Sequence, residues 1–86
     1  AAPSRLYWAD RPAVRVVQAL HWMQDMLDQD SERRRVRTVL RRLFADPRHG
    51  QAIRDDLRAG LSALPIWMQE FLRGLLDPAE TDEARQ

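Results

Sequence analysis

Apolar residues recur at helical spacing along most of this chain, and no segment shows the alternation of a half-buried strand. Asp10 followed by Pro12 predicts a helix start, because Asp accepts unpaired backbone amides and Pro is tolerated in the first turn. This first helix is expected to run to about Asp28. Its apolar positions are Val16, Val17, Ala19, Leu20, Trp22, Met23, Met26 and Leu27. They cover roughly 220° of the helix, more than packing on one side needs.

Asp30 and Ser31 predict the N-terminal cap of a second helix, which ends at Phe44 or Ala45. Its apolar residues repeat at intervals of three and four and predict one narrow core face. That face comprises Val36, Val39, Leu40, Leu43 and Phe44. Asp46-Pro47 is expected to stop this helix and to cap the next one.

Two shorter helices complete the pattern. The third starts at Pro47 or after Gly50, and a break at Gly60 and Ser62 separates it from a fourth that begins near Pro65. The fourth helix is expected to end near Asp77-Pro78. The inward residues of these two segments are Ile53, Leu57, Leu61, Leu64, Met68, Phe71, Leu72, Leu75 and Leu76. Because the linkers are short, neighbouring helices should be roughly antiparallel.

The pattern therefore predicts an all-α fold, a compact bundle of four helices with short loops and no sheet. Residues 10–77 form the helical bundle domain. Residues 1–9 form an N-terminal strap, in which Leu6, Tyr7 and Trp8 lie across the bundle. Residues 78–86 lack apolar anchors and form a flexible acidic tail.

One octet of the first helix nearly recurs in the fourth. Residues 20–27 read LHWMQDML and residues 65–72 read PIWMQEFL, so both copies place Trp, Met, Met or Phe, and Leu at helical spacing. Indoles and thioethers suit protein contact surfaces, but they suit ordinary cores as well. Trp22 and Trp67 are therefore either core residues of two packed helices or members of an exposed docking face.

Composition narrows the class of protein. The 86 residues allow one domain, and the absence of Cys removes disulfides, thiolate zinc sites and cysteine nucleophiles. All 14 basic residues are Arg, which we attribute to the codon usage of a GC-rich bacterial genome. No segment is apolar enough to span a membrane, and the first residues show no signal-peptide pattern. We expect a soluble cytoplasmic protein, and the start at Ala1 suggests a domain of a longer chain.

Six Arg residues cover the polar face of the second helix. They are Arg33, Arg34, Arg35, Arg37, Arg41 and Arg42. This face could bind nucleic acid or another anionic surface. However, the net charge is only +1, acidic residues precede and follow the Arg run, and aromatic residues are not interleaved with it. A solvated face that is compensated within the chain is the favoured interpretation.

The sequence gives little support for a catalytic, metal or cofactor site. Ser4, Ser31 and Ser62 lie in the tail or at caps, and three glycines leave no room for a phosphate loop or a nucleophile elbow. His21, Asp25 and Asp28 share one side of the predicted first helix, but no second helix supplies matching ligands. We expect no catalytic residue, no metal and no cofactor.

The sequence thus favours a non-catalytic protein-interaction or adaptor module. It would dock another protein, or a second copy of itself, through a face containing Trp22, Met26, Trp67 and Phe71. Arg35, Arg41 and Arg42 would supply charge selectivity at the rim. The alternative from another class is nucleic-acid or anionic-surface binding through the Arg-rich second helix.

Overall fold

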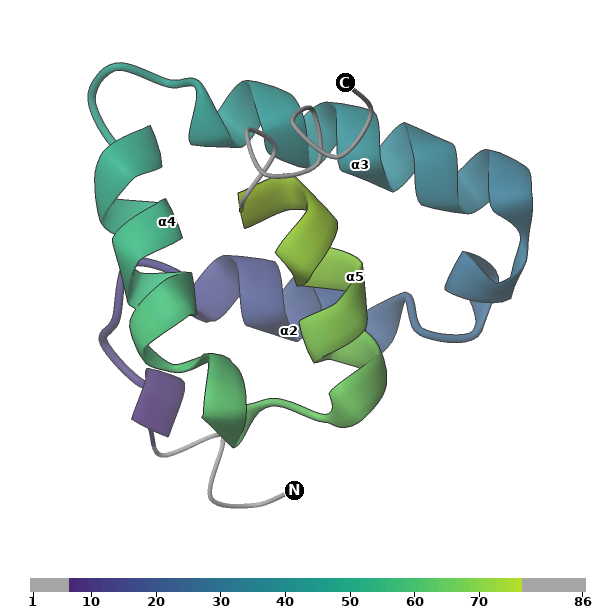
Figure 1. The fold of residues 1–86 in the computed structure, drawn as a ribbon, viewed down its shortest axis with the longest axis horizontal. Coiled ribbons are helices and arrows are strands. Elements are labelled where there is room, and N and C mark those ends of the chain that lie inside the picture. Colours follow the sequence, from purple (N-terminus) through teal and green to yellow (C-terminus); the bar gives the residue numbers. More distant parts are fainter. Residues whose placement is uncertain (1–6, 77–86) are drawn as a thin grey trace, which may run out of the picture.

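The computed structural model describes residues 7–76, which form four α-helices and two short 3₁₀ turns without any strand (Figure 1). The elements are α2 (Val14–Trp22), η1 (Met26–Asp28), α3 (Asp30–Phe44), α4 (Gly50–Ala59), η2 (Leu61–Ala63) and α5 (Ile66–Leu76). The prediction of an all-α bundle of four helices is confirmed. Leu6, the end of the fourth helix at Asp77-Pro78 and the acidic tail lie outside the described residues.

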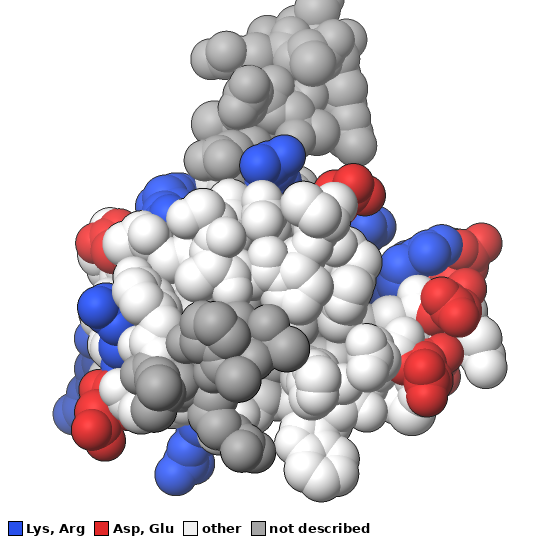
Figure 2. Space-filling model, turned by 90° about the horizontal axis from the view of Figure 1, so that it is seen from below, with Lys and Arg blue, Asp and Glu red and all other residues white. Residues whose placement is uncertain are grey.

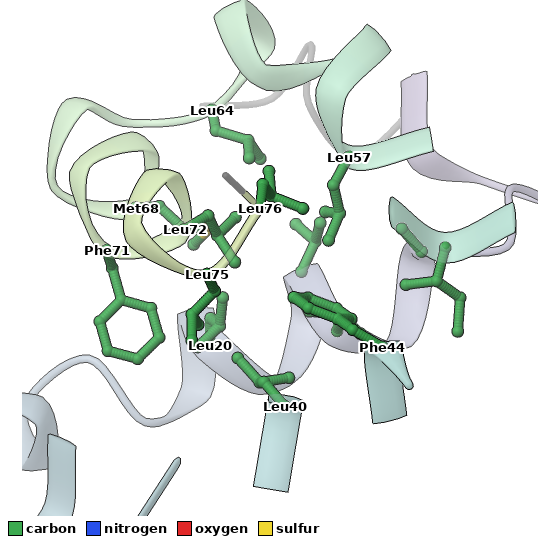
Figure 3. Packing of buried hydrophobic residues seen from close by; sticks show 14 of the residues in the cluster. Leu20, Leu40, Phe44, Leu57, Leu64, Met68, Phe71, Leu72, Leu75 and Leu76 are labelled. Carbon is green, nitrogen blue, oxygen red and sulfur yellow. The ribbon is translucent and has the colours of Figure 1, made fainter. Parts of the chain in front are cut away.

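Helix α5 supplies the centre of the core. Its apolar residues recur at intervals of three and four, so one stripe faces inward. The buried members of that stripe are Met68, Phe71, Leu72, Leu75 and Leu76. Leu20 of α2, Leu57 of α4 and Leu40 and Phe44 of α3 surround it (Figure 3). The prediction that these five residues of the fourth helix face inward is therefore confirmed.

The helices do not all run antiparallel to their neighbours in the chain. In the view of Figure 1, α2 and α3 run in opposite directions, whereas α4 and α5 run across them. The crossing begins at the sharp turn after α3, where the Asp46 carboxylate accepts the backbone N–H of His49 at 2.9 Å. Asp46 therefore stabilises the turn that leads into α4, but it does not cap that helix as predicted, because α4 begins at Gly50 with His49 as its N-cap and has no side-chain cap.

A buried carboxylate joins α4 to the start of α2. Asp56, 8% exposed, accepts the backbone N–H of Ala13 at 3.0 Å and the Arg11 guanidinium at 3.1 Å. Ala13 is the N-cap residue of α2, and no side chain of its own segment caps that end. Because helix N-termini carry unpaired N–H groups and partial positive charge, the carboxylate serves α2 as a cap supplied from α4.

Arg11 extends this contact to the strap residues. Its Nε donates to the Tyr7 carbonyl at 3.0 Å, and its guanidinium lies 4.1 Å from the centre of the Tyr7 ring. Trp8 packs edge-on against Tyr7 and is 1% exposed. Gly60 lies directly beneath both rings, because a Cβ there would approach them to 2.5–2.6 Å. Trp8 of the strap is thus part of the core, and the half-buried Tyr7 packs against it.

The first helix is shorter than predicted, because α2 ends at Trp22 rather than near Asp28. The N–H of Met23 bonds to the carbonyls of both Ala19 and Leu20, which tightens the last turn. The chain then turns, and the N–H of Leu27 bonds back to the Met23 carbonyl. This turn brings Leu27, 5% exposed, into the core, where η1 contacts α3. The turn and η1 therefore occupy the residues for which the sequence predicted further helix.

Helix α3 has the predicted length but a different orientation about its axis. Leu40 and Phe44 are buried, Val36 and Leu43 are half-buried, and Val39 is 57% exposed, so the prediction that Val39 faces the core is wrong. The centre of the contact face is shifted away from Val39. At about 100° per residue, this shift turns Arg33 and Arg37 toward the core.

The start of α3 also differs from the prediction. Gln29 is its N-cap residue and makes no side-chain cap, whereas Asp30 lies inside the helix and pairs with Arg33. Asp30 and Glu32 in the first turn, and Arg41 and Arg42 in the last, match the helix dipole. This placement offsets part of the repulsion among the Arg residues.

Replacing Asp56 with Ala is expected to lower the free energy of unfolding by about 2–3 kcal/mol, because Ala13 N–H and Arg11 lose their shared acceptor. Urea denaturation followed by circular dichroism measures the loss. Asp55→Ala is the matched control, since that exposed carboxylate makes only surface contacts and should change stability by less than about 0.5 kcal/mol. Equal losses would show that the Asp56 contact does not stabilise the fold.

Two glycine substitutions should have opposite effects. Gly60→Ala forces a methyl group into the Tyr7 and Trp8 rings and is expected to destabilise by about 1–3 kcal/mol. Gly74→Ala adds a methyl group that meets nothing within 4 Å in α5, and should stabilise by about 0.5–1 kcal/mol. Thermal melts of the two variants test this, and a stabilised Gly60→Ala variant would contradict the described packing of the strap.

Candidate functional site

Four large apolar side chains remain exposed on the described surface. Trp22 is 85% exposed, Ile66 68%, Val39 57% and Met26 46%. Trp22 is the largest of them and is the last residue of α2. Leu20, two residues earlier, is fully buried, and positions two apart on a helix point about 200° apart. The indole therefore faces solvent because the buried face of α2 faces the other way.

A groove of about 550 Å³ lies beside this segment, between η1, α3 and α5. Leu27, Trp67 and Phe71 supply its apolar surface. Arg33 and Arg37 of α3 form a basic side, whereas Asp25, Asp28 and Glu70 provide carboxylates on the other elements. We call this feature the α3–α5 groove.

The charges of the α3–α5 groove are mostly unpaired within residues 7–76. Arg33 pairs with Asp30, just outside the groove. The Arg37 guanidinium lies 5.3 Å from the centre of the Phe71 ring, a cation–π distance, and forms no ion pair with a described residue. Asp25, Asp28 and Glu70 likewise form no ion pair with the described part of the chain. Three carboxylates and one guanidinium are thus available to a partner.

The two similar octets meet at this groove. The first contributes Gln24, Asp25 and Leu27, and the second contributes Trp67, Glu70 and Phe71. Asp25 and Glu70 occupy equivalent positions in the two copies. The copies nevertheless differ in structure, because the first spans the end of α2 and the turn after it, whereas the second lies mostly in α5. The repeated composition therefore builds two unlike sides of one groove.

The predicted docking residues do not form one exposed patch. Trp22 and Met26 are exposed, Trp67 is half-buried in the groove, and Phe71 is only 6% exposed at the edge of the core (Figure 3). The prediction that Phe71 shares the exposure of Trp22 is therefore wrong. Its helical position explains this, because Phe71 lies one turn after Met68 and one turn before Leu75 on the buried stripe of α5.

The Arg residues predicted for the rim of the docking face also lie elsewhere. Arg35, Arg41 and Arg42 are exposed on α3, and none of them lines the groove. Arg33 and Arg37 do so instead, and the analysis of the sequence did not single them out as site residues. A signal was present, since Arg33, Arg37, Leu40 and Phe44 follow one another at intervals of four, three and four, so the two Arg residues extend the buried stripe of α3.

Among the described residues, charged side chains lie at the edges of one face of the molecule. Figure 2 shows a broad uncharged area with Arg, Asp and Glu at its edges. The lower side of Figure 1, which this view presents, carries η2 and the start of α5. Residues 59–69 contain no charged side chain, and Ile66 is 68% exposed among them. Such a face is more typical of protein contacts than of binding to a phosphate backbone.

Other kinds of site are not evident in the part of the chain that is described. His21, Asp25 and Asp28 do not share one helix face, because α2 ends before Asp25. Within residues 7–76, no three His, Asp or Glu residues gather in a way that could hold a metal ion. Every helix in the same range is too short or too polar to cross a membrane.

Comparisons with protein-family models, with curated proteins and with solved structures gave no match. Function is therefore argued from the exposed Trp22 side chain and the neighbouring α3–α5 groove.

Proposed function

We propose that this chain is a non-catalytic helical protein-interaction module whose main contact residue is Trp22. The observation that carries the proposal is the exposure of the Trp22 indole, which is 85% accessible in a fold that buries Trp8 almost completely. Exposed apolar residues scattered singly are ordinary. Trp22, however, is the largest side chain available, and tryptophan is strongly enriched among the residues that contribute most to protein binding.

The surroundings of Trp22 support the same function. Met26 follows within the turn after α2 and is 46% exposed, so an adaptable thioether lies on the same short segment. The α3–α5 groove starts at Gln24, two residues from the indole, and offers an apolar surface between opposite charges. Arg33 and Arg37 would therefore select a partner by charge. Arg35, Arg41 and Arg42 would act only at longer range, by attracting an acidic partner.

Polar replacement of the docking residues is the direct test. In Trp22→Ser/Met26→Ser, the free energy of unfolding should change by less than about 1 kcal/mol, because both side chains are already exposed. Association with a second copy or a purified partner should be lost. The matched control is Trp8→Ser, which removes a buried indole and should cost about 3–5 kcal/mol. Losses of equal size would place Trp22 in the core and overturn the proposal.

A second candidate function is binding of nucleic acid through α3. Arg34, Arg41 and Arg42 are exposed and form no ion pair within residues 7–76, which favours an anionic partner. Against it, Asp30 and Glu32 pair with Arg33 and Arg35 on the same helix.

Fluorescence anisotropy with a labelled DNA duplex at low salt discriminates the two functions. If the chain is a protein-interaction module, it should not bind the DNA duplex. Binding that falls steeply with added salt, and that disappears in Arg37→Gln/Arg41→Gln/Arg42→Gln, would instead establish the second candidate.

A further inference from the structure

We propose that the α3–α5 groove receives Trp22 of a second copy of this chain, in an isologous two-fold dimer. This inference rests on the proposed function and specifies its partner. In such a dimer the same surface serves both subunits, so it must contain the inserted group and the receiving site together. The Trp22 indole and the groove meet this requirement, because only Met23 separates Trp22 from Gln24, the first residue that lines the groove.

The groove offers an indole one aromatic contact. Its apolar surface comes from the half-buried Trp67 ring and from the edges of Leu27 and Phe71, which are 5% and 6% exposed, and its volume of about 550 Å³ exceeds what one side chain occupies. The half-buried Trp67 ring allows aromatic stacking, which adds to the gain from burial. Transfer of the indole out of water and filling of the groove both favour association.

The charges of the groove argue for a second copy rather than for a uniformly acidic or basic partner. The basic side carries Arg37, and the opposite side carries Asp28 and Glu70; none of the three forms an ion pair within residues 7–76. A two-fold axis through the groove brings the basic side of one copy to the acidic side of the other, twice. The net charge of +1 adds almost no repulsion between copies.

The expected association is weak. Each buried indole contributes at most about 150–250 Å², and a contact made of two such insertions is smaller than the roughly 800 Å² per partner of a stable complex. We therefore expect a reversible dimer that forms between micromolar and millimolar protein and dissociates on dilution.

Exchange of charges between copies tests the arrangement. Arg37→Glu places two carboxylates opposite each other at positions 37 and 70 of the two copies, and Glu70→Arg places two guanidinium groups there. Each variant alone should therefore dimerise at least about tenfold more weakly than the unchanged chain. An equimolar mixture should recover dimers, because positions 37 and 70 then carry opposite charges at both contacts of a mixed dimer. Sedimentation velocity of the complete chain over the full concentration range measures the masses. Circular dichroism confirms folding, and Arg33→Glu replaces Arg37→Glu if the latter is unstable.

Trp22→Ser separates the failure of this inference from the failure of the proposed function. A dimer that is lost in Trp22→Ser and in both charge variants, and is recovered in the mixture, supports the inference. A chain that stays monomeric at millimolar concentration overturns it, and so does a dimer that needs Trp22 but is not recovered in the mixture. Either of these results leaves the proposed function standing with another protein as the partner. A dimer that persists unchanged in Trp22→Ser overturns both.

Discussion

The fold depends on one buried carboxylate. Asp56 of α4 accepts the N–H at the start of α2 and the guanidinium of Arg11, so a single side chain fixes where the first long helix begins. Burial of a charge costs several kcal/mol unless it is paired and hydrogen-bonded, and Asp56 satisfies that condition with two donors. Arg11 carries the constraint onward through the carbonyl and the ring of Tyr7. Trp8 then closes over Gly60, where any larger residue would collide with it.

The Asp56 contact holds only the N-terminal end of α2. The N-terminal end is tied to α4, whereas the C-terminal end stops at Trp22 and continues as a turn whose only buried residue is Leu27. Few backbone bonds hold that turn, and they link Met23 to Met26 and Leu27. The exposed indole and one edge of the α3–α5 groove therefore lie at the end of α2 that is not tied to α4, next to the turn where η1 packs against α3.

The apolar pattern was sufficient to predict most of the fold. It identified the buried residues of α5 one by one, the extent of α3 and the break at Gly60, because spacing of three and four residues directly encodes a helix face. It could not locate the end of α2. No Gly or Pro follows Trp22 to mark the stop, and the turn that replaces the helix is seen only in how η1, with the buried Leu27, packs against α3. The rotation of α3, which exposes Val39, is likewise a property of packing between helices.

The site was predictable only in part, for the same reason. Trp22 and Met26 were found because their types and spacing are informative, but the groove depends on which side of α3 faces α5. Trp22 and Leu20 lie on opposite sides of α2, and this fold buries the side of Leu20 and leaves Trp22 85% exposed. Position 22 is therefore a surface position, and a small polar residue there should be tolerated. The fold gains nothing from the exposed indole of Trp22. We therefore infer that this side chain contributes to binding of a partner.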